Sequence, residues 1–589
     1  TFTGSATVAD ASGNLPNIDI AKDSGTLTLA GTIRTGRKWT YTRGTLNPGT
    51  STVIFGDGGG SVSSGTGVIT GTHTLFNVQF RDDEFSSYGW WIINPGTTLT
   101  ASGALTIATG VNGSAALYVD GNLIAQGDVT VGSHLSNNGS SGTGAITLTG
   151  GNNQLLNIAN LPMGNITITK SGGVATLARN LALNQTANQS LTINSGTLDL
   201  AGYTLSVNGT LTNNGAILAG GAGTPITAGT LISTVATSQV TYTGNGADGA
   251  VTVKTGTYGN LVVDNPGTTF TLNGAATVKG NLTIAAGSIL DVSTSNYGLT
   301  VAGNWANAGT FTPRSGTVTL NGANPTLTGA TTFYKLSKSA GGGQTLTLPA
   351  GVITTVQNSL TLAGSSANNP LYLRSSVGGT PALLTLQSGG TQSLLYLDVK
   401  DSNASGGVAL IAYDSVNSGN NTNWSFQPLS TALANGLLAH WTFDEGSGSA
   451  AADASGNGRN GTLTNATWTT GKYGGALSFN GTSARVAGPS ISLGSAFTVS
   501  AWINNPANDA EAIMSVGEVR EFSIYLDHLF FWEGGAGLTF HDDVNDTPPN
   551  NVWYHVVYTY DGTNLRAYFN GNPFSTPQAA SLGAVTGAL

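Results

Sequence analysis

The chain has 589 residues, of which 8% are charged and 85 are Gly, and its formal net charge is −9. Sparse charge of this sign, without a basic run, makes nucleic acid or an anionic membrane surface a poor partner. Apolar residues make up 39% of the chain and recur periodically, which argues against disorder, and the lack of Cys excludes a disulfide framework. No apolar run of about 18 residues is present, so we expect no membrane-spanning helix.

Short alternating segments predict β-strands from the N-terminal part onwards. In residues 25–29 and 39–42, apolar or aromatic side chains alternate with Thr, which is the period of a half-buried strand. The tripeptide Asn-Pro-Gly follows such segments at residues 47–49, 94–96 and 265–267. Pro suits the second position of a type II turn and Gly suits the third, where φ is positive, so each tripeptide predicts a turn between strands.

The alternating segments also recur at long range. Residues 281–311 repeat the pattern of residues 191–217, with Leu282 matching Leu191. Long repeats begin near residues 51, 145, 239 and 316. Each is too long for one coil and predicts several coils of roughly 20 to 30 residues.

A single coil of this length buries too few side chains to offset the backbone entropy that it loses. Stacked coils share contacts with the coils above and below, so we expect one continuous parallel β-helix over residues 1–427. The alternative is a string of immunoglobulin-like domains of about 90 residues each. The strands predicted here are very short for that architecture, and no Trp recurs at a fixed place in each repeat.

The repetitive part ends with the sequence SGNNTNW at residues 418–424. This ending resembles the last coils of bacterial secreted β-helix proteins with adhesin-like repeats. The resemblance implies that the rod stops here, and residues 428–436 are expected to form a linker. The chain begins at Thr1 rather than at Met, as a processed secreted protein or a part of a longer chain would.

Beyond residue 436 aromatic and charged residues become denser. Ordered motifs follow one another, namely LAHWTFDEG at 438–446, GALSFNG at 475–481, FTVSAWI at 497–503, WYHVV at 553–557 and LRAYFNG at 565–571. Their succession resembles the laminin G-like, concanavalin A-like jelly-roll domains of bacterial surface proteins. The resemblance implies an antiparallel β-sandwich over residues 437–589. The expected fold class is therefore all-β, with a long parallel β-helix (solenoid) followed by an antiparallel jelly-roll β-sandwich.

The same resemblance implies a departure near the C-terminal end. After Asn570-Gly571 the family normally adds further strands, whereas this sequence stops at Leu589. We therefore expect a sandwich that lacks its last strand or strands, unless another strand fills the gap. An open sandwich edge is a ready pairing site, which motivates the hypothesis that copies of this chain assemble into a filament.

A calcium site is the first candidate site that the resemblance implies. Relatives often hold calcium in the stretch that corresponds to the oxygen-bearing residues Asp444, Asp453, Ser455, Asn457 and Asn460. Carboxylates, amides and hydroxyls are suitable ligands for a hard cation. The alternative is a plain turn made of turn-forming residues.

A ligand-binding surface is the second candidate site. Domains of this type commonly bind sugars or proteins on a sheet face or at loop ends, and the candidate contacts here are Trp532, His541, Asp542 and Asp543. Sugar recognition typically stacks a sugar ring on an aromatic face beside polar groups. For each residue the alternative is core packing or a solvated loop.

One acidic cluster raises the question of catalysis. Asp82, Asp83 and Glu84 are followed by Trp90 and Trp91, and clustered carboxylates are what a polysaccharide lyase or glycoside hydrolase requires. The alternative is an exposed loop whose aromatic residues cover the side of the rod. Acidic residues elsewhere are scattered, and no metalloprotease, serine hydrolase or nucleotide-binding motif is present, so we expect no enzyme.

These features together favour a secreted or cell-surface structural and adhesive protein. Its expected partners are copies of itself, a glycan or a surface protein. A lectin-like carbohydrate-binding protein is one alternative. A polysaccharide lyase or glycoside hydrolase built on the β-helix is the other.

Overall fold

A computed structural model describes most of the chain. The described residues are 6–56, 66–81, 90–107, 116–132, 145–158, 161, 164–185, 187–244, 250–339, 343–428, 436–504, 511–517, 519–525, 528–533, 536–540, 551–574 and 576–589. All regular secondary structure within them is β-strand, so none of them forms a helix that could cross a membrane. The chain divides into two compact units, Thr1–Pro428 and Leu429–Leu589.

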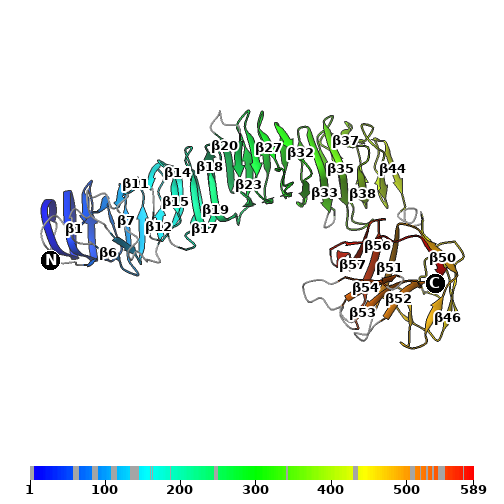
Figure 1. Ribbon diagram of the computed structural model, residues 1–589. Coiled ribbons are helices and arrows are strands. Elements are labelled where there is room, and N and C mark those ends of the chain that lie inside the picture. Colours follow the sequence, from blue (N-terminus) through cyan, green and yellow to red (C-terminus); the bar gives the residue numbers. More distant parts are fainter. Residues whose placement is uncertain are drawn as a thin grey trace. The chain divides into compact units, whose positions relative to one another are not determined.

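The first unit is a parallel β-solenoid (Figure 1). One coil consists of β2 (Thr52–Phe55), β3 (Thr66–Thr70) and β4 (His73–Leu75). The next coil places its strands in parallel register on these: β5 (Asn77–Phe80) on β2, β6 (Trp90–Ile93) on β3 and β7 (Thr98–Ala101) on β4. Three stacks of strands therefore run along the solenoid, and we name them the β2, β3 and β4 stacks.

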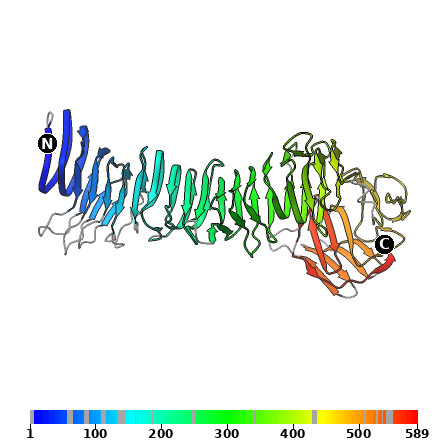
Figure 2. The ribbon, with the colours of Figure 1, turned by 90° about the horizontal axis from the view of Figure 1, so that it is seen from above.

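The coil length agrees with the expectation from the sequence. In the β2 stack, Leu261 of β23 (Asn260–Val263) pairs with Leu282, which pairs in turn with Trp305, so these residues follow one another 21 and 23 positions apart. Figure 2 shows the same parallel stacking along the solenoid in a second view. The prediction that short strands lie on their equivalents one coil later is confirmed.

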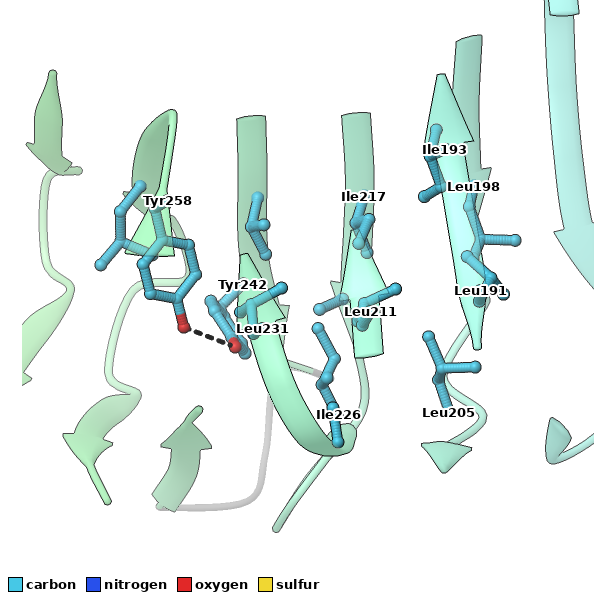
Figure 3. Close-up of a cluster of buried hydrophobic side chains, with 14 of the residues drawn as sticks. Leu191, Ile193, Leu198, Leu205, Leu211, Ile217, Ile226, Leu231, Tyr242 and Tyr258 are labelled. Atoms are coloured by element: carbon cyan, nitrogen blue, oxygen red, sulfur yellow. Dashed lines mark hydrogen bonds between the residues drawn. The ribbon is translucent and has the colours of Figure 1, made fainter. Parts of the chain in front are cut away.

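A single apolar core runs through the coils. Leu191 and Ile193 of β16 (Leu191–Asp199) and Leu211 of β17 (Leu205–Asn213) point inwards and are buried (Figure 3). The buried apolar residues form one cluster that extends from Ile20 to Ala412. A string of separate immunoglobulin-like domains would have several cores, so that alternative is wrong.

The outward positions of the same strands carry Thr. In the β4 stack Thr147 pairs with Thr167, Thr167 with Thr192 and Thr192 with Thr212, and all four are only partly buried. Successive side chains of a strand point to opposite faces, so the alternation of Leu or Ile with Thr separates the core from the solvent surface.

The Asn-Pro-Gly turns form as predicted in two of the three copies. The amide of Thr97 donates to the carbonyl of Asn94 (3.0 Å), and the amide of Thr268 donates to that of Asn265 (3.1 Å). Gly267 has a φ of +82°, a region that Gly adopts readily because it has no Cβ. In the first copy the bond is displaced by one residue, from the amide of Ser51 to the carbonyl of Pro48 (3.1 Å).

The sequence repeats do not coincide with positions in the coil. Leu191 lies in the β4 stack, through the pairing of β16 with β14 (Asn165–Leu177) and β12 (Ala145–Leu148). Leu282, its match in the sequence, lies in the β2 stack. The long repeats near residues 51 and 239 begin with β2 and β20 (Gln239–Gly244), which share the β2 stack. The long repeat near residue 145 begins with β12, which belongs to the β4 stack. Copies of a repeated sequence can thus lie on different faces of the solenoid.

Aromatic residues cover the last coils of the solenoid. Its last strand, β44 (Trp424–Gln427), pairs with β41 (Leu410–Tyr413). The rings of Trp424 and Phe426 stack with centroids 5.9 Å apart, and both pack against the core. The Trp424 indole also donates to the Ser402 hydroxyl (3.2 Å).

The second unit is a sandwich of antiparallel sheets. Its five-stranded sheet contains β51 (Phe497–Ile503), β56 (Tyr554–Tyr560), β57 (Asn564–Phe569), β58 (Asn572–Pro573) and β59 (Gln578–Ala579). Its four-stranded sheet contains β52 (Glu511–Val516), β53 (Arg520–Tyr525), β54 (His528–Glu533) and β55 (Ala536–Phe540). Tyr558 and Phe522 pack between them with ring centroids 5.3 Å apart, and the Tyr558 hydroxyl donates to the Ser523 carbonyl (2.8 Å). The predicted β-sandwich is confirmed.

Smaller sheets complete this unit. Their strands are β45 (Ala450–Ala451), β46 (Gly461–Thr464), β47 (Thr467–Thr470), β48 (Gly475–Ser478), β49 (Arg485–Ala487), β50 (Ser490–Leu493) and β60 (Val585–Ala588). β60 pairs with β50, and the amide of Gly517, next to β52, donates to the carbonyl of Ala588 (2.7 Å). The segment after Asn570-Gly571 therefore contributes strands to the edges of the sandwich.

Candidate ligand-binding groove

The solvent-facing side of the five-stranded sheet carries aromatic residues. Along β56, Tyr554, Val556 and Tyr558 are buried against the other sheet, so His555 between them faces outwards. Trp502 of β51 is the cross-strand partner of His555. Directly paired residues of an antiparallel ladder lie side by side, so the two rings meet on the outer face.

An open groove of about 490 Å³ lies at this position. Four separate segments of the chain line it with Lys472, Tyr473, Trp502, Trp553, His555, Asn570 and Gly571. Lys472 and Tyr473 come from the turn between β47 and β48, and the others come from β51, the start of β56 and the turn after β57. Large aromatic side chains gathered in an open hollow are typical of a binding surface.

Ring contacts hold the aromatic residues in place. The Trp502 and His555 rings stack with centroids 5.1 Å apart, and Tyr473 meets Trp502 edge-on at 5.4 Å. The Lys472 ammonium lies 5.6 Å from the centroid of Trp502, within the range of a cation–π interaction. Trp502 nevertheless remains 39% exposed and Tyr473 71% exposed, so a ligand can reach both rings.

Hydrogen bonds fix the orientation of His555. Its Nε2 lies 2.7 Å from the Ser500 hydroxyl, its amide donates to the Asn570 side chain (2.9 Å), and the Asn570 amide donates back to its carbonyl (2.9 Å). Burial lowers the pKa of His555, so the imidazole is neutral at pH 7. Because Nε2 is engaged by Ser500, Nδ1 is the ring atom of this neutral imidazole that is left for a ligand.

The groove has the composition of a binding site. A Ser500–His555 pair could serve as nucleophile and base, but no described carboxylate hydrogen-bonds to this His to orient it. Among the described lining residues there is also no Asp or Glu, whereas glycoside hydrolysis normally uses two carboxylates. Aromatic faces beside amide, imidazole and ammonium groups suit the recognition of a ligand that is partly apolar and partly polar.

The ligand contacts expected from the sequence lie elsewhere. Trp532 belongs to β54, in which Leu529 and Phe531 are buried, so it points to the outer side of the four-stranded sheet and does not line the groove. His541, Asp542 and Asp543 lie outside the described residues. The acidic cluster of Asp82, Asp83 and Glu84 also lies outside them.

The residues proposed for calcium include a tightly bonded turn at Asp453. The carboxylate of Asp453 accepts from the amides of His440, Ser455 and Arg459 (2.9 Å each) and from the Ser455 hydroxyl (2.8 Å). Burial raises the pKa of this carboxyl, but these hydrogen bonds outweigh it and hold the pKa well below its usual range. The Asp453 oxygens therefore already have donors from the chain itself.

The other members of that set also bond to the chain. Asp444 accepts from the amide of Gly475 (2.7 Å), the Asn460 side-chain oxygen accepts from the amide of Asp453 (2.9 Å), and the Asn457 amide group donates to the Leu437 carbonyl (2.8 Å). Among the described residues no group of three or more His, Cys, Asp or Glu is placed to hold a metal ion. Calcium binding at this turn stays a prediction.

Sequence reasoning missed the residues of the groove, although a signal was present. Trp502 and His555 lie in two of the motifs whose succession indicates the β-sandwich. In those strands alternation places Val499 and Val556 in the core, which leaves the two rings on the opposite face. An aromatic residue at a solvent-facing strand position is the feature that could have identified the site.

Comparisons with known proteins agree with the fold of this unit. Residues 480–587 match a family model described as the concanavalin A-like lectin/glucanases superfamily. Trp502, Trp553 and His555 lie within the matched segment, and Lys472 and Tyr473 precede it.

One solved structure is similar to part of the chain. It is domain 4 of AbnA, a GH43 extracellular arabinanase from Geobacillus stearothermophilus, in complex with arabinotriose. The identity is 20%, the alignment covers 26% of this chain and 81% of that chain, and the TM-score is 0.21, a similarity too weak to carry an argument. Comparison with curated proteins found no match.

Proposed function

We propose that this is an extracellular adhesive protein whose C-terminal unit binds a glycan in the groove described above. The observation that carries the proposal is the exposure of Trp502 and Tyr473 beside the polar groups of His555 and Asn570. A sugar ring has apolar C–H faces that pack on aromatic rings, and its hydroxyls require donors and acceptors at the ring edge. The lectin/glucanase-like fold of residues 480–587 supports this use of the groove.

The solenoid is proposed to act as the scaffold of this binding unit. Many of its strands pair with strands of both neighbouring coils, and its interior is one continuous apolar cluster, which together resist bending. A stiff element that carries a glycan-binding unit is suited to attachment at a surface. A secreted or cell-surface location is part of this proposal.

Assembly into a filament is a further element of the proposal. Among the described strands β50 pairs only with β60, and the other edge of such a strand can accept a strand from another copy. Analytical ultracentrifugation over a range of protein concentrations tests this point. Growth of large species with concentration supports assembly, and a single monomeric species at the highest concentration contradicts it.

A glycan screen with matched variants tests the binding proposal. The full-length chain and its Trp502→Ala and Phe479→Ala variants are applied to an array of polysaccharides and oligosaccharides. Phe479 is the control because it is also an exposed aromatic residue of this unit, at 51%, but does not line the groove. We expect the wild type and Phe479→Ala to bind the same glycans and Trp502→Ala to lose them. Absence of glycan binding by the wild type, or retention in Trp502→Ala, would overturn the proposal.

A further inference from the structure

The groove is lined by a cationic side chain, Lys472, that pairs with no described carboxylate. Residues 436–589 contain no other Lys. Lys472 is exposed, lies beside Trp502, and makes no ion pair with any carboxylate among the described residues. No described lining residue of the groove is acidic. An ammonium group in this setting remains available to a ligand.

Three of the four arginines in residues 436–589 are already engaged. Arg520 is fully buried and pairs with Glu533 (2.6 Å). Arg566 pairs with Asp561 (2.5 Å), and Arg459 donates to the carbonyl of Leu438. The fourth, Arg485, lies outside the groove, so Lys472 is set apart by its position in the groove.

We propose that the groove selects an anionic glycan, with a sugar ring packed against Trp502 and Tyr473 and a carboxylate or sulfate group of the ligand bound to Lys472. This inference rests on the proposed function and adds the chemical class of the ligand. The ammonium lies 5.6 Å from the centroid of the Trp502 ring, so one sugar unit can contact the ring and the charge together.

The charge of the surrounding unit makes Lys472 the decisive contact. Residues 436–589 contain 13 Asp and Glu against five Lys and Arg, so the unit as a whole does not attract anions. At physiological salt, exposed charges are screened beyond about 8 Å. Selectivity for an anionic sugar must therefore come from direct contact with Lys472.

Lys472 also lies outside the segment that matches the family model. Lys472 and Tyr473 belong to the turn between β47 and β48, ahead of residue 480 where the match begins. The shared fold supplies Trp502 and His555, and the preceding turn supplies the charge. We therefore expect the turn to determine which glycans bind.

The test compares ligands that differ in charge. Binding of the full-length chain to polygalacturonate, dextran sulfate and neutral pullulan is measured at about 0.15 M salt, the ionic strength at which distant charges are screened. The variants are Lys472→Gln, Lys472→Arg and, as a matched charge control, Arg485→Gln. Arg485 is exposed on β49 and does not line the groove.

We expect the wild type, Lys472→Arg and Arg485→Gln to prefer one or both anionic polymers over pullulan by at least about tenfold, which corresponds to about 1.4 kcal/mol. Lys472→Gln is expected to lose that preference. The comparison of polygalacturonate with dextran sulfate identifies the carboxylate or the sulfate as the anion.

Equal binding of neutral and anionic polymers by the wild type, or an unchanged preference in Lys472→Gln, would overturn the inference. A Trp502→Ala variant separates this failure from failure of the proposed function. If Trp502→Ala abolishes binding while Lys472→Gln leaves the preference intact, glycan binding stands and only the assignment of ligand class is wrong. If Trp502→Ala has no effect, both are wrong.

Discussion

The indole N–H of Trp39 donates a hydrogen bond to Nε2 of His73 across 2.8 Å inside the solenoid. The other ring nitrogen, Nδ1, lies 2.9 Å from the carbonyl of Gly71, to which only a protonated Nδ1 can donate. Both partners therefore require a neutral imidazole with its proton on Nδ1. Burial lowers the pKa of His73 to about 4, although the bond to Gly71 opposes this shift.

This pair predicts a loss of stability in mild acid. The pKa of His73 is 6.5 in the unfolded chain and about 4 in the folded chain, so the unfolded state binds more protons between these values. The contribution of neutral His73 is fully present above about pH 6.5 and falls by up to about 3 kcal/mol as the pH decreases to 4. Urea unfolding, followed at several pH values, measures it.

A His73→Gln variant serves as the control for that measurement, because Gln keeps an acceptor for Trp39 without titrating. Its unfolding midpoint should change less between pH 7 and pH 4.5 than the midpoint of the wild type. Equal pH dependence of the two proteins would show that His73 does not carry the effect.

Truncation of the Trp305 side chain should destabilise the solenoid core. Trp305 is fully buried between Leu282 and Leu327 of the neighbouring coils, and its ring contacts those of Phe311 and Phe333 at 4.9 and 5.1 Å. We expect Trp305→Ala to lower the free energy of unfolding by about 3–5 kcal/mol, because the cavity is too large to collapse. Trp305→Leu, which restores the residue type found at neighbouring positions of the stack, should cost less. Similar denaturation midpoints for Trp305→Ala and the wild type would contradict this prediction.

Replacing either of two glycines with similar φ angles by Ala should lower the free energy of unfolding, but by very different amounts. Gly267 (φ +82°) has open space where a Cβ would lie, whereas a Cβ on Gly329 (φ +76°) would lie 1.7 Å from the carbonyl oxygen of Asn307 in the adjacent coil. Gly267→Ala should cost about 1–2 kcal/mol from backbone strain alone. Gly329→Ala adds a clash that must push two coils apart and should cost at least about 3 kcal/mol. Equal unfolding midpoints for the two variants would show that coil spacing is not rigid at this point.

The Asp453 turn predicts a local weakness in the C-terminal unit. Asn at this position can accept at only one side-chain atom, so Asp453→Asn leaves some of the four donors unsatisfied and should lower the melting temperature of this unit. The same melting temperatures, measured with and without calcium, test whether calcium binds at this turn. A rise in the wild-type melting temperature with calcium that disappears in Asp453→Asn would support a metal here, and no rise in either protein would leave the turn as a purely hydrogen-bonded structure.

The architecture of the solenoid could be predicted from local sequence because its physical cause is local. Alternation of apolar residues with Thr defines strands, and Asn-Pro-Gly defines turns such as the one at Gly267. The stack to which each strand belongs could not be predicted. Leu191 and Leu282 are each followed by Thr-Ile but lie in different stacks, because all three faces bury the same alternating pattern.

The groove could not be assembled from the sequence for a different reason. Trp502, His555 and Asn570 are distant in the chain, and the pairing of β51 with β56 and of β56 with β57 brings them together. Lys472 joins them from the separate turn between β47 and β48. Alternation alone could have placed Trp502 and His555 on the outer face. The register that makes them direct partners is a property of the folded sheet.

Calorimetric titration of one glycan identified in the screen into Trp502→Ala and Phe479→Ala, each shown to be folded by circular dichroism, tests glycan binding in the groove most directly. We predict that Phe479→Ala binds with the wild-type Kd and that Trp502→Ala binds at least about tenfold more weakly, which corresponds to a loss of at least about 1.4 kcal/mol. Equal Kd values for the two variants would contradict the account.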